Sequence, residues 1–273
     1  MHINIKSFDE LKRKKFFITD IHGAYKALLQ CLERSNFDYD KDILIIGGDI
    51  CDGWSEVYEC IEEFLKIKHV ICILGNHDDA FIHWMNRGTH PWGWLQGASA
   101  TAESYIRNSE RKEQLILIPH EGAFLTNLTY FDIPFSHREF FAKMKPYFID
   151  PDNRLFIHAG LDRRKPIEEQ SINTLLWDRT FIQRALCHKE KNHKFKVVGN
   201  FKEIYLGHTT TQLWKRTIPM KGSHVYNLDT GAGWTGKATI MNIDTKEYWQ
   251  SDKVSDLYPN EYGRRGYKLK KKR

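Results

Sequence analysis

Residues 42–53 read DILIIGGDICDG, and the fold of the chain can be derived from this stretch. The run DILII, residues 42–46, is apolar after Asp42, which is typical of a strand buried on both faces of a sheet. Two glycines follow, and Asp49 and Asp52 then stand in the loop. The stretch therefore predicts an acidic loop at the carboxyl end of a buried strand.

The chain on either side repeats this arrangement of an apolar run followed by a polar loop. The flanking runs are residues 15–19 (KFFIT) and 70–74 (VICIL). Residues 24–34 and 55–66 lie between the three runs and have apolar positions at helical spacing. Strands and helices alternating in this way predict parallel strands with right-handed crossovers. We therefore expect an α/β fold whose polar loops lie together at one edge of the sheet.

The pattern changes after the third run. Residues 79–152 predict helices at 100–107 and 138–144, and we interpret this segment as an insertion that covers the site and shapes substrate choice. The insertion holds three clustered tryptophans, which are Trp84, Trp92 and Trp94. They could stack on a base or a peptide aromatic, although a place in the core of the insertion is the simpler interpretation.

The last part of the chain returns to strands. Residues 154–157 predict a strand that ends at His158, and residues 203–250 alternate in a way that predicts antiparallel strands. Because no fixed repeat or long linker interrupts the chain, residues 1–260 are expected to form a single domain. Residues 261–273 then form a basic tail that we expect to be disordered.

Composition and charge exclude several classes of protein. The 273 residues are 41% hydrophobic, without an apolar run of about 18 residues, so no membrane span is expected. The five cysteines form no CxxC pair, which indicates reduced thiols in the cytoplasm. The net charge of +6 equals that of the tail alone, which has seven basic residues and one acidic residue. The neutral body argues against a broad nucleic-acid surface, so RNA, DNA or anionic lipid could be contacted only through the tail.

Five short motifs in a fixed order carry the chemistry. They read Asp20-Ile-His22-Gly, Gly-Asp49-Ile-Cys-Asp52-Gly, Gly-Asn76-His77-Asp, His158-Ala-Gly and Gly-His208-Thr. The eight residues numbered here supply three carboxylates, four imidazoles and one amide. This set suits a pair of divalent metals, and such a pair hydrolyses phosphate esters. We expect Mn²⁺, with Fe, Zn²⁺, Mg²⁺ and Ni²⁺ as alternatives.

These motifs resemble the calcineurin-like metallophosphoesterase superfamily and, more narrowly, its phosphoprotein-phosphatase branch, from Asp20 to about Trp249. The resemblance implies two central β-sheets flanked by helices, with the metals held at one edge. It also implies a role for each metal ligand. Asp20 and His22 would bind the first metal, Asp49 would bridge both, and Asn76, His158 and His208 would bind the second.

The same resemblance implies a mechanism. A hydroxide that bridges the two metals would attack phosphorus in line. His77 is similar to the general acid of the family, and Asp52 would hold its imidazole. Thr210 stands where many relatives have a further histidine, which matches the phosphoprotein-phosphatase branch.

Phosphate recognition departs from the family pattern. The branch has one arginine after the Asp52 position and another before the GNH motif, but this chain has Gly53 and Leu74 there. Arg179, in Trp177-Asp-Arg, is the candidate phosphate ligand, because a guanidinium fork matches two phosphate oxygens. Arg87 or Arg107 of the insertion could compensate for the absent arginines.

The sequence thus predicts a cytoplasmic two-metal phosphatase that hydrolyses phosphomonoesters, with phosphoserine or phosphothreonine in proteins as the leading substrate. Hydrolysis of a dinucleoside polyphosphate such as diadenosine tetraphosphate is the closest alternative, supported by the form Leu74-Gly-Asn-His-Asp78 and by the tryptophans of the insertion. Removal of phosphate from RNA or DNA ends is a third interpretation. A binding module that has lost catalysis is the fourth, and the complete set of metal ligands argues against it.

Overall fold

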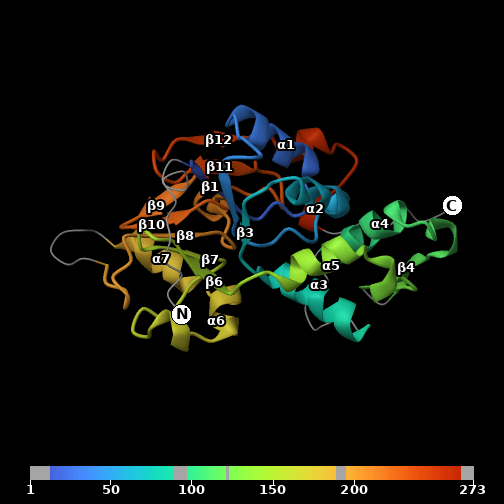
Figure 1. Cartoon of the computed structure of the whole chain (residues 1–273), viewed down its shortest axis with the longest axis horizontal. Coiled ribbons are helices and arrows are strands. Elements are labelled where there is room, and N and C mark those ends of the chain that lie inside the picture. The colour runs from blue at the N-terminus through green and yellow to red at the C-terminus, as the bar shows by residue number, and fades with distance from the viewer. Residues whose placement is uncertain (1–12, 89–96, 121–122, 189–194, 266–273) are drawn as a thin grey trace.

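The computed structural model describes residues 13–88, 97–120, 123–188 and 195–265. Two five-stranded sheets form its centre (Figure 1). The first sheet has the order β12 (Tyr248–Gln250), β11 (Thr239–Asn242), β1 (Lys15–Ile18), β2 (Ile43–Ile46) and β3 (Val70–Cys72). The second sheet has the order β6 (Tyr147–Ile149), β7 (Arg154–Ile157), β8 (Glu203–Leu206), β10 (Val225–Asn227) and β9 (Met220–Gly222). The expected α/β fold with two central sheets is confirmed.

The two sheets pack face to face through aromatic side chains. Phe17 of β1 is fully buried, and its ring centroid lies 5.6 Å from that of Phe156 of β7 and 5.8 Å from that of Tyr205 of β8. The neighbouring residues Phe16 and Ile18 point to the opposite face, because side chains alternate along a strand. Each sheet therefore has one face in the central core and one face covered by helices.

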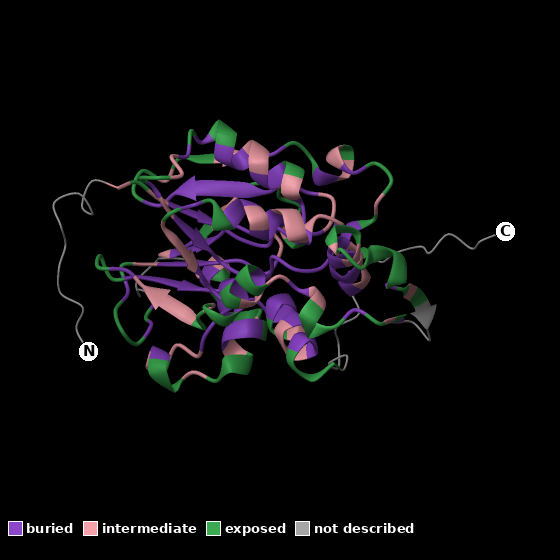
Figure 2. Ribbon diagram, turned by 45° about the vertical axis from the view of Figure 1, so that its right-hand side comes forward, coloured by how far each residue is buried: buried purple, intermediate pink, exposed green. Residues whose placement is uncertain are grey.

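Helices cover both outer faces, and their exposed residues face away from the sheets (Figure 2). The helices α1 (Tyr25–Arg34) and α2 (Val57–Leu65) pack on the first sheet, and α6 (Ile172–Trp177) and α7 (Thr180–Cys187) pack on the second. The short helix α8 (Val254–Leu257) contacts α1. No helix among these described residues has the length and apolar character that crossing a membrane requires.

Strand direction agrees with the prediction in the first part of the chain and differs in the last part. The strands β1, β2 and β3 are parallel, and β11 and β12 form the expected antiparallel pair. However, β8 and β10 are parallel, so the expectation of antiparallel strands throughout residues 203–250 is wrong. The chain between them crosses over through the 3-10 turn η5 (Thr211–Trp214) and the edge strand β9. Alternation shows which faces of a strand are buried, but it does not show which strand lies beside it.

The insertion extends to one side of the sandwich, at the right of Figure 1. The helix α3 (Asn76–Arg87) begins in the GNHD motif and leads into the insertion. The insertion then contains α4 (Ala98–Asn108), η2 (Lys112–Gln114), the hairpin of β4 (Leu117–His120) and β5 (Ala123–Thr126), η3 (Tyr130–Asp132) and α5 (Phe135–Ala142). Because β6 already belongs to the second sheet, the insertion ends before Tyr147 and not at residue 152. Trp84 is buried and its ring stacks on Phe81, so it is a core residue, whereas Trp92 and Trp94 lie outside the described residues.

The packed part of the C-terminal segment extends beyond residue 260, where the sequence predicted that the domain ends. The turn η4 (Ile167–Glu169) precedes α6, and the last described element of the chain is the turn η6 (Gly263–Arg265). The carboxylate of Glu261 accepts hydrogen bonds from the amide and the hydroxyl of Ser55, at 3.0 and 2.8 Å. The packed body therefore extends to Arg265, and residues 266–273 of the expected basic tail lie outside the described residues.

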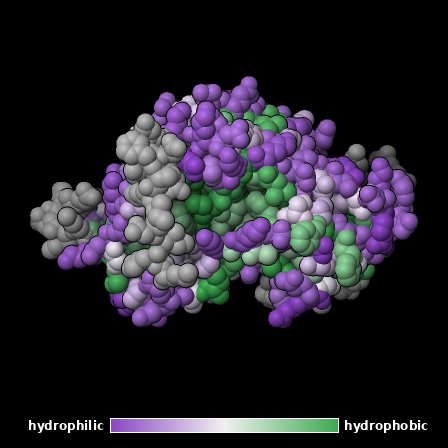
Figure 3. Space-filling view, in the orientation of Figure 1, coloured by the Kyte–Doolittle hydropathy of each residue, from purple (hydrophilic) through white to green (hydrophobic). Residues whose placement is uncertain are grey.

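One face of the molecule has a hollow near its middle where hydrophobic residues gather inside a hydrophilic rim (Figure 3). A pocket of about 460 Å³ opens beside β3, and Leu65, Ile71 and Phe140 are among its lining residues. None of the lining residues carries one of the five motifs, so this pocket is separate from the predicted site.

Candidate metal centre

The five motifs meet where the carboxyl ends of both sheets come together. The amide of Asp20, after β1, donates to the carbonyl of Gly48 after β2 at 3.0 Å. In the second sheet, the amide of Gly207 donates to the carbonyl of His158 at 2.9 Å. The amide of His208 then donates to the Asp20 carboxylate at 3.0 Å, which joins the two sheets. The motif loops therefore form one hydrogen-bonded unit.

The backbone of this unit is unusual. Five motif residues have φ between 51° and 68°, in the left-handed region, and they are Asp20, His22, Asp49, Asp52 and His208. Residues other than glycine rarely adopt this backbone conformation, and those that do concentrate at functional sites. The turns aim the polar side chains at one another instead of continuing the strands.

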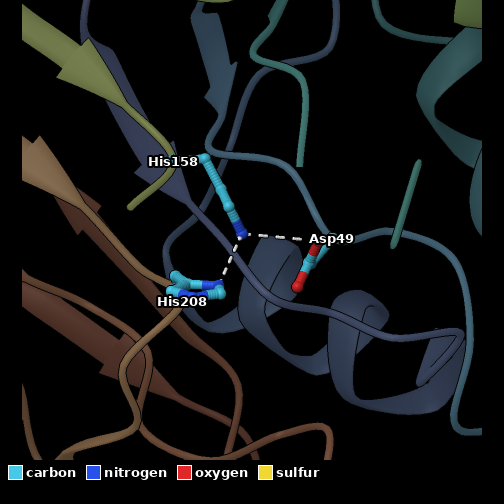
Figure 4. A group of neighbouring side chains, drawn as sticks. All are labelled: Asp49, His158 and His208. Carbon is cyan, nitrogen blue, oxygen red and sulfur yellow. Dashed lines mark hydrogen bonds and ion pairs between the residues drawn. The ribbon is translucent and has the colours of Figure 1, made fainter. Parts of the chain in front are cut away.

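Two groups of side chains could each hold a cation. Asp20, His22 and Asp49 form the first group, and Asp49, His158 and His208 form the second (Figure 4). Within each group the candidate ligand atoms all lie within 4.8 Å of one another, and every residue is buried. Asp49 belongs to both groups, so its carboxylate would be shared if both groups held a cation.

Hydrogen bonds orient the imidazoles for this purpose. Nδ1 of His22 lies 2.9 Å from the carbonyl of Cys51, and Nδ1 of His158 lies 2.8 Å from the carbonyl of Gly47. A carbonyl accepts only, so each Nδ1 carries a proton, and Nε2 is the ring nitrogen that faces the site and can bind a cation when it is unprotonated. Among the described residues, the buried Asp49 Oδ2 has no hydrogen-bond donor. A buried carboxylate oxygen without a donor, facing imidazole lone pairs, fits a cation.

The charges of the group also fit a cation. Burial raises the pKa of Asp20 to about 6, although the nearby His158 opposes this rise. Burial alone would raise the pKa of Asp49 too, but His158, His77 and His22 lower it well below the usual range. In the protein without metal, His158 therefore neutralises Asp49, with its Nε2 at 3.4 Å from Oδ1. A divalent cation can take over this role.

Asp78 fixes the loop that carries Asp49. Its Oδ2 accepts from the amide of Asp49 at 2.7 Å, and its Oδ1 accepts from the amides of Ile50 and Cys51 at 2.9 and 3.1 Å. Asp78 is fully buried in the first turn of α3, so the GNHD motif begins a helix and is not the loop that the sequence suggested. We infer that Asp78 positions Asp49, a role that the motif alone did not indicate.

His77 and Asp52 lie together as the sequence suggested. Nδ1 of His77 is 2.7 Å from Oδ2 of Asp52, and the other carboxylate oxygen, Oδ1, accepts from the hydroxyl of Thr101 at 2.6 Å. The Thr101 oxygen also accepts from the amide of Asp52 at 2.8 Å. The insertion, through Thr101 of α4, therefore helps to hold the predicted acid pair.

The remaining predicted residues lie around the second cation group. The Asn76 Oδ1 is 3.1 Å from Nε2 of His158, which places Asn76 beside that group. Arg179 donates from Nη1 to the carbonyl of His208 at 2.8 Å. Arg107, which was expected to compensate for an absent arginine, instead pairs with Glu59 on the surface at 2.8 Å.

Arg264 also lies at the site, although no sequence motif marks it. This residue is buried, and its Nη1 lies 3.4 Å from Nε2 of His22. It belongs to the basic segment that was read as a disordered tail. The pairing of Glu261 with Ser55 helps to hold this segment beside the site.

Two central sheets with two candidate cation groups at one edge fit a metallophosphoesterase. The sequence model of the calcineurin-like phosphoesterases matches residues 14–216, and the chain belongs to this family. It is therefore a metal-dependent phosphoester hydrolase. This result confirms the resemblance that the five motifs carried.

Two relatives bear the same name, symmetrical bis(5'-nucleosyl)-tetraphosphatase. The chain is 22% identical over 288 residues to the protein of Coxiella burnetii strain CbuG_Q212, which covers 91% of the chain and 97% of that protein. It is 39% identical over 64 residues to the protein of Buchnera aphidicola strain Tuc7. That second match spans only 23% of either chain.

Solved structures have the same fold. A structure assigned as a candidate diadenosine tetraphosphatase superposes with a TM-score of 0.59 at 14% identity, over 88% of this chain and 94% of that one. A cold-active protein-tyrosine phosphatase of a psychrophilic Shewanella species gives a TM-score of 0.52 at 14% identity, over 88% and 80%. At this identity the similarity establishes the fold alone.

Manganese affinity should rise between about pH 7 and pH 9. Burial lowers the pKa of His158, but Asp49 raises it more, and the pKa reaches about 9 instead of 6.5. A metal ligand must be neutral, so binding near neutral pH releases this proton, and affinity should rise up to about tenfold per pH unit. Calorimetric titration in buffers of different ionisation enthalpy measures the protons released.

The pH dependence of the stability of the metal-free protein gives a second measurement of the same group. The raised pKa of His158 stabilises the metal-free fold fully below pH 6.5, and this contribution is lost as the pH rises through about 9. The metal-free protein should therefore melt at a lower temperature at high pH, whereas the manganese-loaded protein should not. His158→Asn is the control, because it removes the titrating group. Manganese binding without proton release near neutral pH would contradict the expected role of His158.

Proposed function

We propose that Asp20, His22 and Asp49 hold one divalent cation and that Asp49, Asn76, His158 and His208 hold a second. When bound, two such cations lower the pKa of water and withdraw charge from a phosphoryl group. Two observations support this proposal: Asp49 is shared between both ligand groups, and its Oδ2 lacks a donor among the described residues.

The protein's own residues then supply the proton and the orientation. His77 lies next to the first ligand group, with its ring centroid 5.0 Å from that of His22. We assign it the role of general acid for the leaving oxygen. Asp52 keeps the His77 ring in one orientation, since its two carboxylate oxygens are held by His77 and by Thr101. Arg179, at the rim beside His208, is the candidate for binding a phosphate oxygen.

For the substrate we propose a symmetrical dinucleoside polyphosphate. The observation that carries this choice is the relationship to the Coxiella protein, which extends over 97% of that protein's length. Trp177 supports it, because 48% of its surface is exposed while its ring centroid lies 6.0 Å from that of His208. An exposed indole at the edge of a phosphate site can stack on a nucleobase. We therefore assign to Trp177 the base-stacking role that the sequence suggested for the tryptophans of the insertion.

A phosphoserine or phosphothreonine protein phosphatase, which the sequence placed first, is the second candidate. The observation that favours it is the 2.7 Å contact between His77 and Asp52. An alkoxide leaves only with a proton, so a positioned acid matters most for an alkyl phosphoester. A leaving phosphate group needs this help less.

Steady-state hydrolysis with Mn²⁺ tests the choice of substrate. We expect kcat/KM for diadenosine tetraphosphate to exceed that for a phosphothreonine peptide by at least about a hundredfold, because only the dinucleotide offers a base to Trp177. p-Nitrophenyl phosphate serves as the common reference. A higher value for the peptide would reverse the order of the two candidates.

His77→Asn should lower kcat for the phosphothreonine peptide by about a hundredfold or more, since general acid catalysis contributes this much. The loss for p-nitrophenyl phosphate should be smaller, because nitrophenolate leaves without a proton. Bound manganese and the melting temperature serve as controls and should stay close to those of the wild type. Equal losses on both substrates would argue against the role of general acid.

Trp177→Ala should raise KM for diadenosine tetraphosphate by about tenfold, because base–aromatic stacking contributes about 1–3 kcal/mol. KM for p-nitrophenyl phosphate should change little. Tyr248→Ala on the outer strand β12 is the matched control, since Tyr248 is also exposed and has no place in the site. An unchanged KM for the dinucleotide would exclude Trp177 as the stacking surface.

A further inference from the structure

Arg264 reaches the candidate centre from a part of the chain that lies beyond the last strand. Its amide donates to the carbonyl of Gly233 at 2.9 Å, and only 9% of the residue is exposed. The guanidinium lies over the ring of Trp234, with 4.9 Å from Cζ to the ring centroid. Its Nη1 is 3.4 Å from Nε2 of His22. The side chain is thus fixed between an indole and a candidate metal ligand.

The space for this side chain exists because two neighbouring positions are glycines. A Cβ at Gly233 would lie 2.8 Å from Cδ of Arg264, which is closer than packed carbon atoms come. A Cβ at Gly53 would lie 3.3 Å from Cγ of Arg264, and the φ of +112° at Gly53 disfavours any side chain there. The Arg264 stem therefore runs directly over Gly53.

Gly53 is the position at which the phosphoprotein-phosphatase pattern has one of its arginines. The chain lacks an arginine there, but a guanidinium enters the same neighbourhood from residue 264. The anchor of this segment is the pairing of Glu261 with Ser55, two residues from Gly53 along the chain. The segment and the Asp52 loop are therefore held together as one structure.

Two arginines stand at the same candidate centre. Arg179 contacts His208 of the second ligand group, and Arg264 contacts His22 of the first. One guanidinium therefore stands beside each candidate cation position, an arrangement that favours an anion between them.

We propose that Arg264 binds the phosphate of the substrate and supplies the contact that Gly53 cannot make. The proposal rests on the phosphoester hydrolysis proposed above, but not on the choice between a dinucleotide and a phosphoprotein. The lone pair of His22 Nε2 cannot serve a cation and an arginine proton at once. A cation held at Nε2 would compete with the Nη1 donor of Arg264 for this lone pair, and that donor could then be shared with a phosphate oxygen of the substrate.

The test uses the full-length, manganese-loaded protein with inorganic phosphate as the probe. Arg264→Met keeps a stem over Gly53 but removes the charge and the donors, whereas Arg264→Lys keeps the charge without the planar fork. In calorimetric titrations, Arg264→Met should weaken phosphate binding about tenfold to a hundredfold, and Arg264→Lys should weaken it less. The KM for p-nitrophenyl phosphate should rise in the same order.

Arg265→Met is the matched control, because the neighbouring side chain is exposed. Its phosphate affinity should stay within about twofold of the wild type. Wild-type phosphate affinity in Arg264→Met would overturn the proposal, and so would a loss of bound manganese, which would make Arg264 a residue that retains metal. A protein that cleaves p-nitrophenyl phosphate but not diadenosine tetraphosphate would refute the proposed substrate alone, since the phosphate titration would still decide the role of Arg264.

Discussion

The buried carboxylate of Asp49 is the group on which both halves of the site depend. It belongs to both cation groups, it pairs with His158 from the second sheet, and its Oδ1 accepts from the amide of His77 at 3.0 Å. The amide of Asp49 is in turn held by Asp78. A displaced Asp49 would therefore disturb the strand loops of both sheets and the first turn of α3 together. Since burial of a charge is costly, this network is complete only with positive charge beside it.

The sandwich supplies the ligand groups, and two later parts of the chain add to them. The insertion contributes Thr101, which holds Asp52, and the C-terminal segment contributes Arg264. Both parts enter near the loop after β2, because the amide of Gly53 donates to the carbonyl of Gly97 at 3.1 Å and Ser55 pairs with Glu261. The core of the family fold thus positions the two candidate ligand groups, whereas these additions lie around the space in which a substrate would bind.

Features that depend on residues close together in the sequence could be predicted, whereas contacts between distant parts of the chain could not. The parallel order of β1 to β3 and the grouping of the motif side chains could be predicted, since apolar runs and strand ends are local patterns. The parallel pairing of β8 with β10 could not, because pairing is decided by distant parts of the chain. Thr101 contacts Asp52, which lies 49 positions away in the sequence, and Arg264 contacts His22, which lies 242 positions away. No local sequence pattern marks such distant contacts. Arg264 also lies in a strongly basic segment, and such a composition is typical of a solvated tail. The hydrogen bonds between Glu261 and Ser55, which hold the segment in place, are not evident from the sequence.

The left-handed turns at the strand ends set the requirements of activity against those of stability. Asp20, His22, Asp49, Asp52 and His208 all have positive φ, a conformation that costs an ordinary L-residue roughly 1 kcal/mol and costs glycine almost nothing. Glycine at any of these positions would relax the backbone and remove a functional side chain in the same step. Selection for heat tolerance alone would therefore drive this fold toward an inert protein. Any thermostable enzyme built on it must gain its extra stability elsewhere, for example in the aromatic layer between the sheets.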